Sequence, residues 1–162
     1  MSLTEGATAP DFSLPATGGR TISLGSLKGK PFVLYFYPRA DTPGCTKEAC
    51  AFQAGLPDFS GLGVTVIGVS KDKMKPLEKF AEKYTLEFPL ASDPEATVID
   101  AYGAWQEKSM YGKKYMGIER STVLVDAAGK IAKLWPKVKI DGHADDVLKA
   151  VRALGQARQE NH

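Results

Sequence analysis

Cysteine and histidine, the residues from which structural disulfides and zinc sites are most often built, are scarce in this sequence. Its 162 residues include 2 cysteines, Cys45 and Cys50, and 2 histidines, His143 and His162. A structural zinc site takes about four such ligands at regular spacings, but both histidines lie far from the cysteines along the chain. Thiols in a reducing cytosol also seldom form structural disulfides. The sequence therefore indicates neither a zinc centre nor a fold held together by disulfides.

The sequence also lacks a charge excess, a long apolar run and a targeting segment. Lys and Arg number 21 against 19 Asp and Glu, a net charge of +2, which predicts binding to neither nucleic acid nor an anionic membrane. The longest apolar run, residues 31–38, is far shorter than the ~20 residues of a membrane-spanning helix. The N-terminus, MSLTEGATAPDFSL, has neither the basic region nor the apolar core of a signal peptide. We therefore expect a cytoplasmic protein without a membrane partner.

No repeat, low-complexity segment or flexible linker divides the chain, so we expect a single domain over residues 1–162. Continuous apolar and β-branched runs at 32–37 and 64–70 are typical of strands covered on both faces. A helix over 43–56 joins these two strands, which predicts that they are parallel. The pattern further predicts short strands over 21–24 and 87–90, helices over 74–84, 93–102 and 143–158, and a hairpin of strands 121–126 and 131–135.

This order of elements matches a thioredoxin-like α/β sandwich, in which helices flank a central mixed β-sheet, here with an N-terminal extension. In the helix over 93–102, Asp93 is the predicted N-cap and Pro94 the first helical residue. The segment 103–119 is rich in aromatic residues and fits three descriptions. It can be a small hairpin that covers a site, a docking surface, or a stretch whose aromatic side chains pack on the core.

Cys45 is placed for nucleophilic chemistry. With Thr42 as N-cap and Pro43 as first helical residue, Cys45 is the third residue of the helix that follows the strand over 32–37. Free backbone N–H groups and the positive end of the helix dipole stabilise a thiolate there. Asp41 and Glu48 would oppose this if they pointed at the sulfur, so we expect a cation from elsewhere in the chain to offset them.

Cys50 lies five residues after Cys45, which is not the CxxC spacing of a thioredoxin-type redox pair. Five residues of helix rise by about 7.5 Å, whereas the Cα atoms of a disulfide lie within about 7 Å of each other. Either the two thiols never pair, or the helix unwinds when they do. Gly55 and Pro57 favour unwinding, because we expect them to weaken the helix and to end it at Leu56.

Several segments together resemble one protein family. They are PRADTPGC (38–45), GCTKEAC (44–50), VIGVSKD (66–72), FPLASDPEATVIDAYG (88–103) and GIERSTVLVDAAGKI (117–131). In this order and spacing they resemble the peroxiredoxins of the bacterioferritin-comigratory, or Q-type, subfamily, over nearly the whole chain. The resemblance implies a thiol-dependent peroxidase for hydrogen peroxide and organic hydroperoxides. It implies that Cys45 is the peroxidatic cysteine, and that Cys50 resolves its sulfenic acid as an intramolecular disulfide that thioredoxin or a similar dithiol reduces.

The same resemblance assigns the rest of the site. It implies that Thr42 and Arg120 complete the active site and that Pro38 shields it, with Arg120 as the missing cation. It implies no metal, haem or flavin, and intramolecular resolution lets a monomer suffice. Relatives commonly carry an Arg-Asp pair where this sequence has Gln53 and Ala54, so an ion pair at that point is in doubt.

Three other functions remain open from the residues alone. A general thiol–disulfide oxidoreductase can use the same fold, although it usually carries CxxC. A binding domain with a static disulfide would need a different helix geometry. A cysteine hydrolase would need His143 as its base, but His143 follows Asp-Gly at the start of a helix, where we expect a cap or surface residue.

Overall fold

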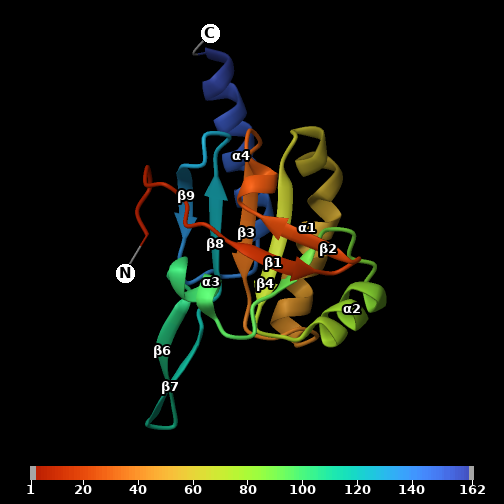
Figure 1. Cartoon of the computed structure of the whole chain (residues 1–162), viewed down its shortest axis with the longest axis vertical. Helices are drawn as coiled ribbons and strands as arrows, with labels where there is room; N and C mark the ends of the chain where they lie inside the picture. Colours follow the sequence, from red (N-terminus) through yellow and green to blue (C-terminus); the bar gives the residue numbers. More distant parts are fainter. Residues whose placement is uncertain (1–2, 161–162) are drawn as a thin grey trace.

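The computed structural model describes residues 3–160 and contains a seven-stranded sheet of order β2-β1-β5-β4-β3-β8-β9 and a separate two-stranded sheet, β6-β7 (Figure 1). His162 lies outside the described residues. The strands are β1 (Ser13–Ala16), β2 (Arg20–Ser23), β3 (Phe32–Phe36), β4 (Thr65–Ser70), β5 (Leu90–Ser92), β6 (Trp105–Met110), β7 (Lys113–Ile118), β8 (Ser121–Val125) and β9 (Ile131–Trp135). The helices are the 3-10 turn η1 (Gly25–Leu27) and the α-helices α1 (Pro43–Gly61), α2 (Met74–Lys83), α3 (Thr97–Ala101) and α4 (His143–Glu160). Within residues 3–160, no helix is both long and apolar enough to cross a membrane.

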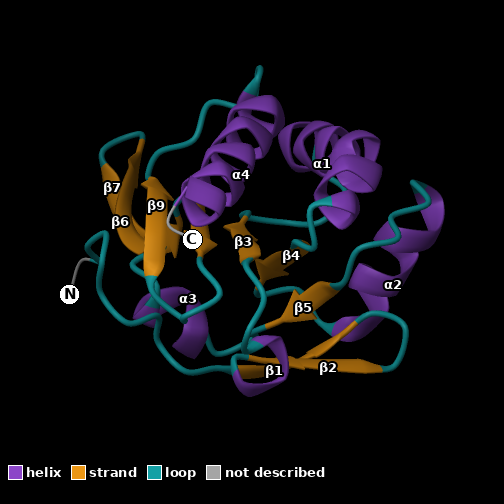
Figure 2. Ribbon diagram, turned by 90° about the horizontal axis from the view of Figure 1, so that it is seen from above, coloured by secondary structure: helices purple, strands orange, loops and turns teal. Residues whose placement is uncertain are grey.

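The central strand β3 contributes side chains to two hydrophobic cores, one on each face of the sheet. It runs parallel to β4 and antiparallel to β8, and every one of its residues is buried. Because side chains alternate along a strand, Val33 and Tyr35 join a core with α1, α2 and α4, whereas Phe32 and Leu34 join a core with α3 and β1. Figure 2 shows α1 and α4 together on one side of the sheet and α3 on the other. The predicted mixed sheet flanked by helices, with parallel β3 and β4 and an antiparallel β8-β9 hairpin, is confirmed.

Helix α1 is longer than predicted. It continues through Pro57 to Gly61 instead of ending at Leu56. Phe52 and Phe59 are both fully buried against the core, on either side of Pro57. Burial of a phenylalanine contributes about 1.5–3 kcal/mol, which offsets the ~3 kcal/mol that proline costs inside a helix. The prediction that the helix ends at Leu56 was therefore wrong, because tertiary packing outweighs local propensity.

The region before and within α3 also differs from the prediction. β5 covers Leu90–Ser92 rather than 87–90. The helix starts at Thr97 rather than after Asp93, because Ala96 takes a left-handed conformation with φ 60° that interrupts it. Asp93 still caps this helix from a distance, since its carboxylate accepts a 2.8 Å hydrogen bond from the Ile99 amide. The short strand β1, which contains Pro15, was not predicted at all.

The segment 103–119 forms a hairpin, one of the three descriptions that the sequence left open. Trp105 pairs with Ile118 at its base, and Trp105 packs against the core beside α3. Towards its tip, Tyr111 is 98% exposed. The hairpin extends away from the main sheet (Figure 1).

Candidate functional site

Cys45 is the third residue of α1, as predicted, and its side chain is buried. Thr42 occupies the N-cap position in extended conformation, and its carbonyl accepts the first helical hydrogen bond from the Thr46 amide at 2.8 Å. The Thr42 hydroxyl does not cap the helix; it donates to the Arg39 carbonyl at 2.8 Å. The amides of the first turn therefore keep their free N–H groups next to Cys45, where an anion is stabilised.

Arg120 reaches Cys45 from a distant part of the sequence. Its guanidinium donates from Nη2 to the Cys45 sulfur at 3.3 Å and from Nη1 to Glu48 Oε1 at 2.7 Å. Arg120 directly precedes β8, whose first residue pairs with the last residue of the antiparallel β3. Because α1 begins just beyond the same end of β3, Arg120 and Cys45 meet there. The structure thus places a cation from a distant part of the sequence beside Cys45.

The two acidic neighbours of Cys45 behave differently. Asp41 turns away, accepting hydrogen bonds from Tyr84 at 2.8 Å and from Lys83 at 3.0 Å, and these hold its pKa below the usual range. Glu48 is only 1% exposed, and burial raises its pKa to about 7 although Arg120 acts in the opposite direction. Its second oxygen, Oε2, has no hydrogen-bond partner among the described residues. Nothing in the sequence signalled that Glu48 would share Arg120 with Cys45.

Cys50 is exposed on the same helix, and both thiols are free. Both belong to one continuous helix, so the pair cannot form a disulfide without a change in this segment. Pro38 is exposed in the loop after β3. Gln53, at the point where the sequence left an ion pair in doubt, forms two hydrogen bonds with Glu87. Its Oε1 accepts from the Glu87 amide at 2.8 Å, and its Nε2 donates to the Glu87 carboxylate at 3.2 Å.

Gly44 allows the close approach between Arg120 and α1. A Cβ atom at this position would lie 3.2 Å from Ile140 Cδ1 and 3.3 Å from Arg120 Nη2. Gly44→Ala is therefore expected to displace the guanidinium and to slow the oxidation of Cys45 by about tenfold, since small misplacements of reacting groups are costly. Single-turnover kinetics with peroxide measures this rate. Gly61→Ala is the matched control, because a Cβ there meets nothing within 4 Å on the same helix; equal rates for both variants would contradict the expectation.

His143 is buried, so the prediction of a cap or surface residue was wrong. Its Nε2 lies 2.7 Å from the Thr122 hydroxyl, and its ring packs edge-on against Phe52 and Trp135. Burial lowers the pKa of His143 to about 4, which keeps the ring neutral. Among the described residues Cys45 has Arg120, and not His143, as its hydrogen-bond partner. The geometry therefore does not support a cysteine hydrolase.

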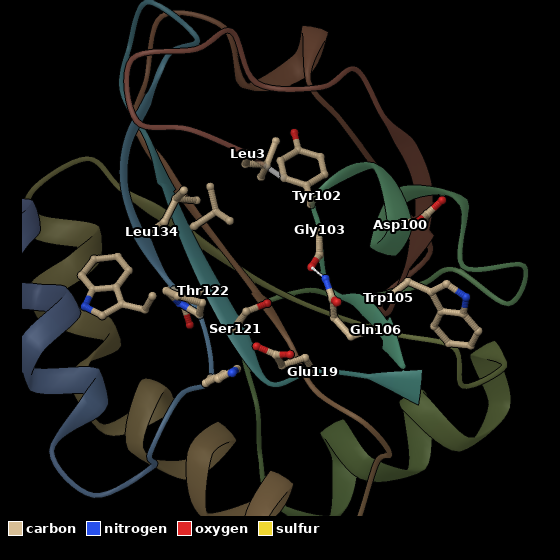
Figure 3. Close-up of a pocket in the computed structure, with 14 residues that line it drawn as sticks. Leu3, Asp100, Tyr102, Gly103, Trp105, Gln106, Glu119, Ser121, Thr122 and Leu134 are labelled. Carbon is tan, nitrogen blue, oxygen red and sulfur yellow. Dashed lines mark hydrogen bonds between the residues drawn. The ribbon is translucent and has the colours of Figure 1, made fainter. Parts of the chain in front are cut away.

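A cavity of about 520 Å³ is lined by residues of β8 and β9 together with residues around α3 and β6 (Figure 3). Tyr102, Trp105 and Leu134 line it and belong to the core beside α3, whereas Cys45 belongs to the core beside α1. Glu119 and Ser121, the chain neighbours of Arg120, also line it. Within the described part of the chain, the predicted site residues do not line this cavity. The cysteine site and the cavity are thus separate features.

Sequence comparison places the chain among known proteins. The family model described as "AhpC/TSA family" matches residues 6–134. A putative peroxiredoxin Bcp of Coxiella burnetii is 51% identical over 148 residues, which is 91% of this chain and 98% of that protein. Peroxiredoxin Bcp of Bacillus subtilis is 42% identical over 156 residues, 96% of this chain and 99% of that protein. The resemblance found in the sequence motifs is confirmed.

Solved structures give the same result. Peroxiredoxin Q of Xanthomonas campestris superposes with a TM-score of 0.86 at 42% identity, covering 89% of this chain and 91% of that one. A mutant of PrxQ from Xylella fastidiosa superposes with a TM-score of 0.89 at 36% identity, covering 94% and 98% of the two chains. These matches confirm the thioredoxin-like fold class.

Proposed function

Because the chain belongs to the AhpC/TSA family and is a peroxiredoxin of the Bcp type, it is a thiol-dependent peroxidase, and we propose that Cys45 is its peroxidatic cysteine and Cys50 its resolving cysteine. The observation that carries the assignment of Cys45 is the 3.3 Å contact between its sulfur and the Arg120 guanidinium. A buried cysteine in the first turn of a helix and beside a cation is in the setting that activates thiols.

In the first proposed step, the Cys45 thiolate attacks one oxygen of the peroxide ROOH. The S–O bond forms as the O–O bond breaks. The sulfur is oxidised to sulfenic acid, which keeps the O–H proton of the peroxide, and the leaving oxygen departs as RO⁻, which takes up one proton from the solvent to become ROH. Arg120 and the free amides of the first turn stabilise the charge that moves onto the leaving oxygen. The Thr42 hydroxyl donates its own hydrogen bond to the Arg39 carbonyl. Towards the peroxide, the Thr42 oxygen therefore accepts a hydrogen bond from the peroxide O–H group. Pro38, in the loop between β3 and α1, shields the active site.

In the second proposed step, the N-terminal part of α1 unwinds and the Cys50 thiol condenses with the sulfenic acid. Water leaves and an intramolecular disulfide remains. The buried Phe52 and Phe59 hold the second half of the helix in place, so the change is confined to the turns around the two cysteines.

Thioredoxin or a similar dithiol then reduces the disulfide by thiol exchange at the accessible end of α1, and no metal, haem or flavin takes part. This cycle fits a cytoplasmic protein, because the cytoplasm contains reducing dithiols. It fits a monomer, because both cysteines belong to one chain. The proposed substrates are hydrogen peroxide and organic hydroperoxides. In support of the latter, a structural study of the X. campestris bacterioferritin comigratory protein addresses the alkyl peroxide reduction activity of that protein.

Mass spectrometry with hydrogen exchange tests this cycle. One equivalent of peroxide is expected to remove about 2 Da, the two thiol hydrogens, from the wild-type chain. Amides 45–52 are expected to lose protection upon oxidation, while those after Phe52 keep it. Cys50→Ser is expected to stop at the sulfenic acid, which dimedone traps at Cys45. Equal protection of amides 45–52 in the reduced and oxidised proteins would contradict the unwinding step.

A further inference from the structure

Asp72 ends the segment VIGVSKD (66–72), and the proposed cycle gives it no role. Strand β4 ends at Ser70, shortly before Asp72, and the parallel strand β3 ends at Phe36 on the same edge of the sheet. The loop over 37–42, which leads into α1, leaves from that edge as well. The carboxyl ends of parallel strands are where sites form in open α/β sheets, and here they bring Asp72 next to this loop.

Asp72 holds one peptide unit of the loop, the one between Arg39 and Ala40. Its Oδ2 accepts a hydrogen bond from the Ala40 amide at 2.8 Å. The carbonyl of the same peptide, which belongs to Arg39, accepts a hydrogen bond from the Thr42 hydroxyl at 2.8 Å. The peptide is therefore bound at both ends. Its N–H group binds a carboxylate, and its C=O group binds the hydroxyl whose oxygen receives the peroxide O–H in the proposed first step.

Three further hydrogen bonds hold Asp72 in place. The Ser70 hydroxyl donates to Oδ2 of Asp72 at 2.8 Å and accepts from the Asp72 amide at 3.2 Å. The hydroxyl of Ser92, the last residue of β5, donates to the Asp72 carbonyl at 2.6 Å. Both serines are buried. A carboxylate that is fixed by buried partners on two strands can orient the group that it binds.

The next residue of the loop has a strained backbone. Asp41 takes φ 59°, in the left-handed region, which costs free energy for a residue other than glycine. Its carboxylate is bound by Lys83 and Tyr84, while Asp72 binds the peptide that precedes it. Contacts on both sides of the strained residue thus stabilise the loop conformation in which Thr42 donates its proton within the loop.

We propose that Asp72 is a positioning residue for the peroxidase reaction. Through the peptide between Arg39 and Ala40, it holds the Thr42 hydroxyl so that the oxygen of Thr42 accepts from the peroxide. The inference rests on the proposed function of Cys45 and Thr42. Hydrogen bonds in a chain polarise one another, so a carboxylate on the N–H of a peptide makes its carbonyl a stronger acceptor. The Thr42 proton then stays on the Arg39 carbonyl, and a lone pair of the Thr42 oxygen is left for the peroxide O–H.

A double-mutant cycle tests this connection. In a Cys50→Ser background, which isolates the first step, stopped-flow kinetics measures the second-order rate constant for hydrogen peroxide. Asp72→Ala is expected to lower this rate constant by about tenfold, within the range for coupled members of one hydrogen-bond network. Thr42→Val is similar in shape but lacks the hydroxyl, and in its presence Asp72→Ala is expected to cause no further loss. A role of Asp72 in stability alone would instead lower the rate constant equally in both backgrounds.

A reagent without an O–H or N–H group gives a second readout. Methyl methanethiosulfonate reacts with the Cys45 thiolate and has no proton for Thr42 to accept, so Asp72→Ala is expected to leave the rate of this reaction unchanged. Asp72→Asn keeps an oxygen acceptor for the Ala40 amide and is expected to recover most of the rate constant for peroxide. Asp72→Leu is similar in size and lacks an acceptor. It repeats the comparison, so that the test does not depend on the folding of one variant.

Controls separate the possible failures. Asp58→Ala removes an exposed carboxylate from α1 and is expected to match the parent. The proposal is overturned if Asp72→Ala matches the parent, if it slows the reaction equally with and without the Thr42 hydroxyl, or if it slows methyl methanethiosulfonate as much as peroxide. An asparagine variant as slow as the alanine variant also overturns it. Absence of a dimedone adduct at Cys45 in the parent, or a parent rate in Thr42→Val alone, would refute the proposed function on which the inference rests.

Discussion

Replacing Cys45 with serine is expected to reduce peroxide consumption to the rate without protein. Only a thiolate at this position combines nucleophilicity with stabilisation by Arg120 and the first turn of α1. A serine hydroxyl stays protonated near neutral pH and cannot form a sulfenic acid. The rate of loss of hydrogen peroxide under excess dithiol measures the effect.

The matched control for this substitution is Cys50→Ser on the same helix. Both replacements exchange sulfur for oxygen, but Cys50 is exposed and has no part in the first step. The Cys50→Ser protein is expected to consume about one equivalent of peroxide per chain at the wild-type rate, as sulfenic acid formation requires. If Cys45→Ser keeps its activity while circular dichroism shows a native fold, Cys45 is not the peroxidatic residue.

Replacing Arg120 with alanine is expected to lower the second-order rate constant for peroxide by about 10²–10³-fold. This is the usual cost of losing one donor that stabilises developing negative charge. The same change removes the hydrogen-bond donor that lies 3.3 Å from the Cys45 sulfur. Stopped-flow kinetics with peroxide measures this rate constant.

Arg120→Ala also leaves Glu48 buried without its partner, which costs about 3–5 kcal/mol when a buried pair is broken. Arg120→Lys separates this loss of stability from the effect on catalysis. Lysine keeps the positive charge but lacks the guanidinium that donates to two partners at once. We expect an intermediate rate for the lysine variant. A wild-type rate in a folded Arg120→Ala protein would remove Arg120 from the mechanism.

The position of Cys45 could be predicted from the sequence because it depends on local chemistry. Thr42 and Pro43 fix where α1 begins, and the strand before it is recognisable from its apolar residues. The contact between Arg120 and Cys45 depends instead on the antiparallel pairing of β8 with β3. The family resemblance anticipated that contact, whereas periodicity and spacing could not.

The features that were missed depend on packing between distant segments. The continuation of α1 past Pro57 rests on burial of Phe59, and the burial of His143 rests on Thr122, Phe52 and Trp135. The sharing of Arg120 by Cys45 and Glu48 requires a guanidinium from 72 residues away. None of these contacts leaves a periodic signal in the sequence.

The central claim is that Cys45 reacts with peroxide and Cys50 passes the oxidation on to a dithiol. Peroxide-dependent consumption of NADPH by thioredoxin and its reductase, compared in the wild type and in both serine variants, tests it most directly. We predict continuous turnover in the wild type, a single equivalent of peroxide consumed without turnover in Cys50→Ser, and no reaction in Cys45→Ser. Sustained turnover in the Cys45→Ser protein would contradict the account.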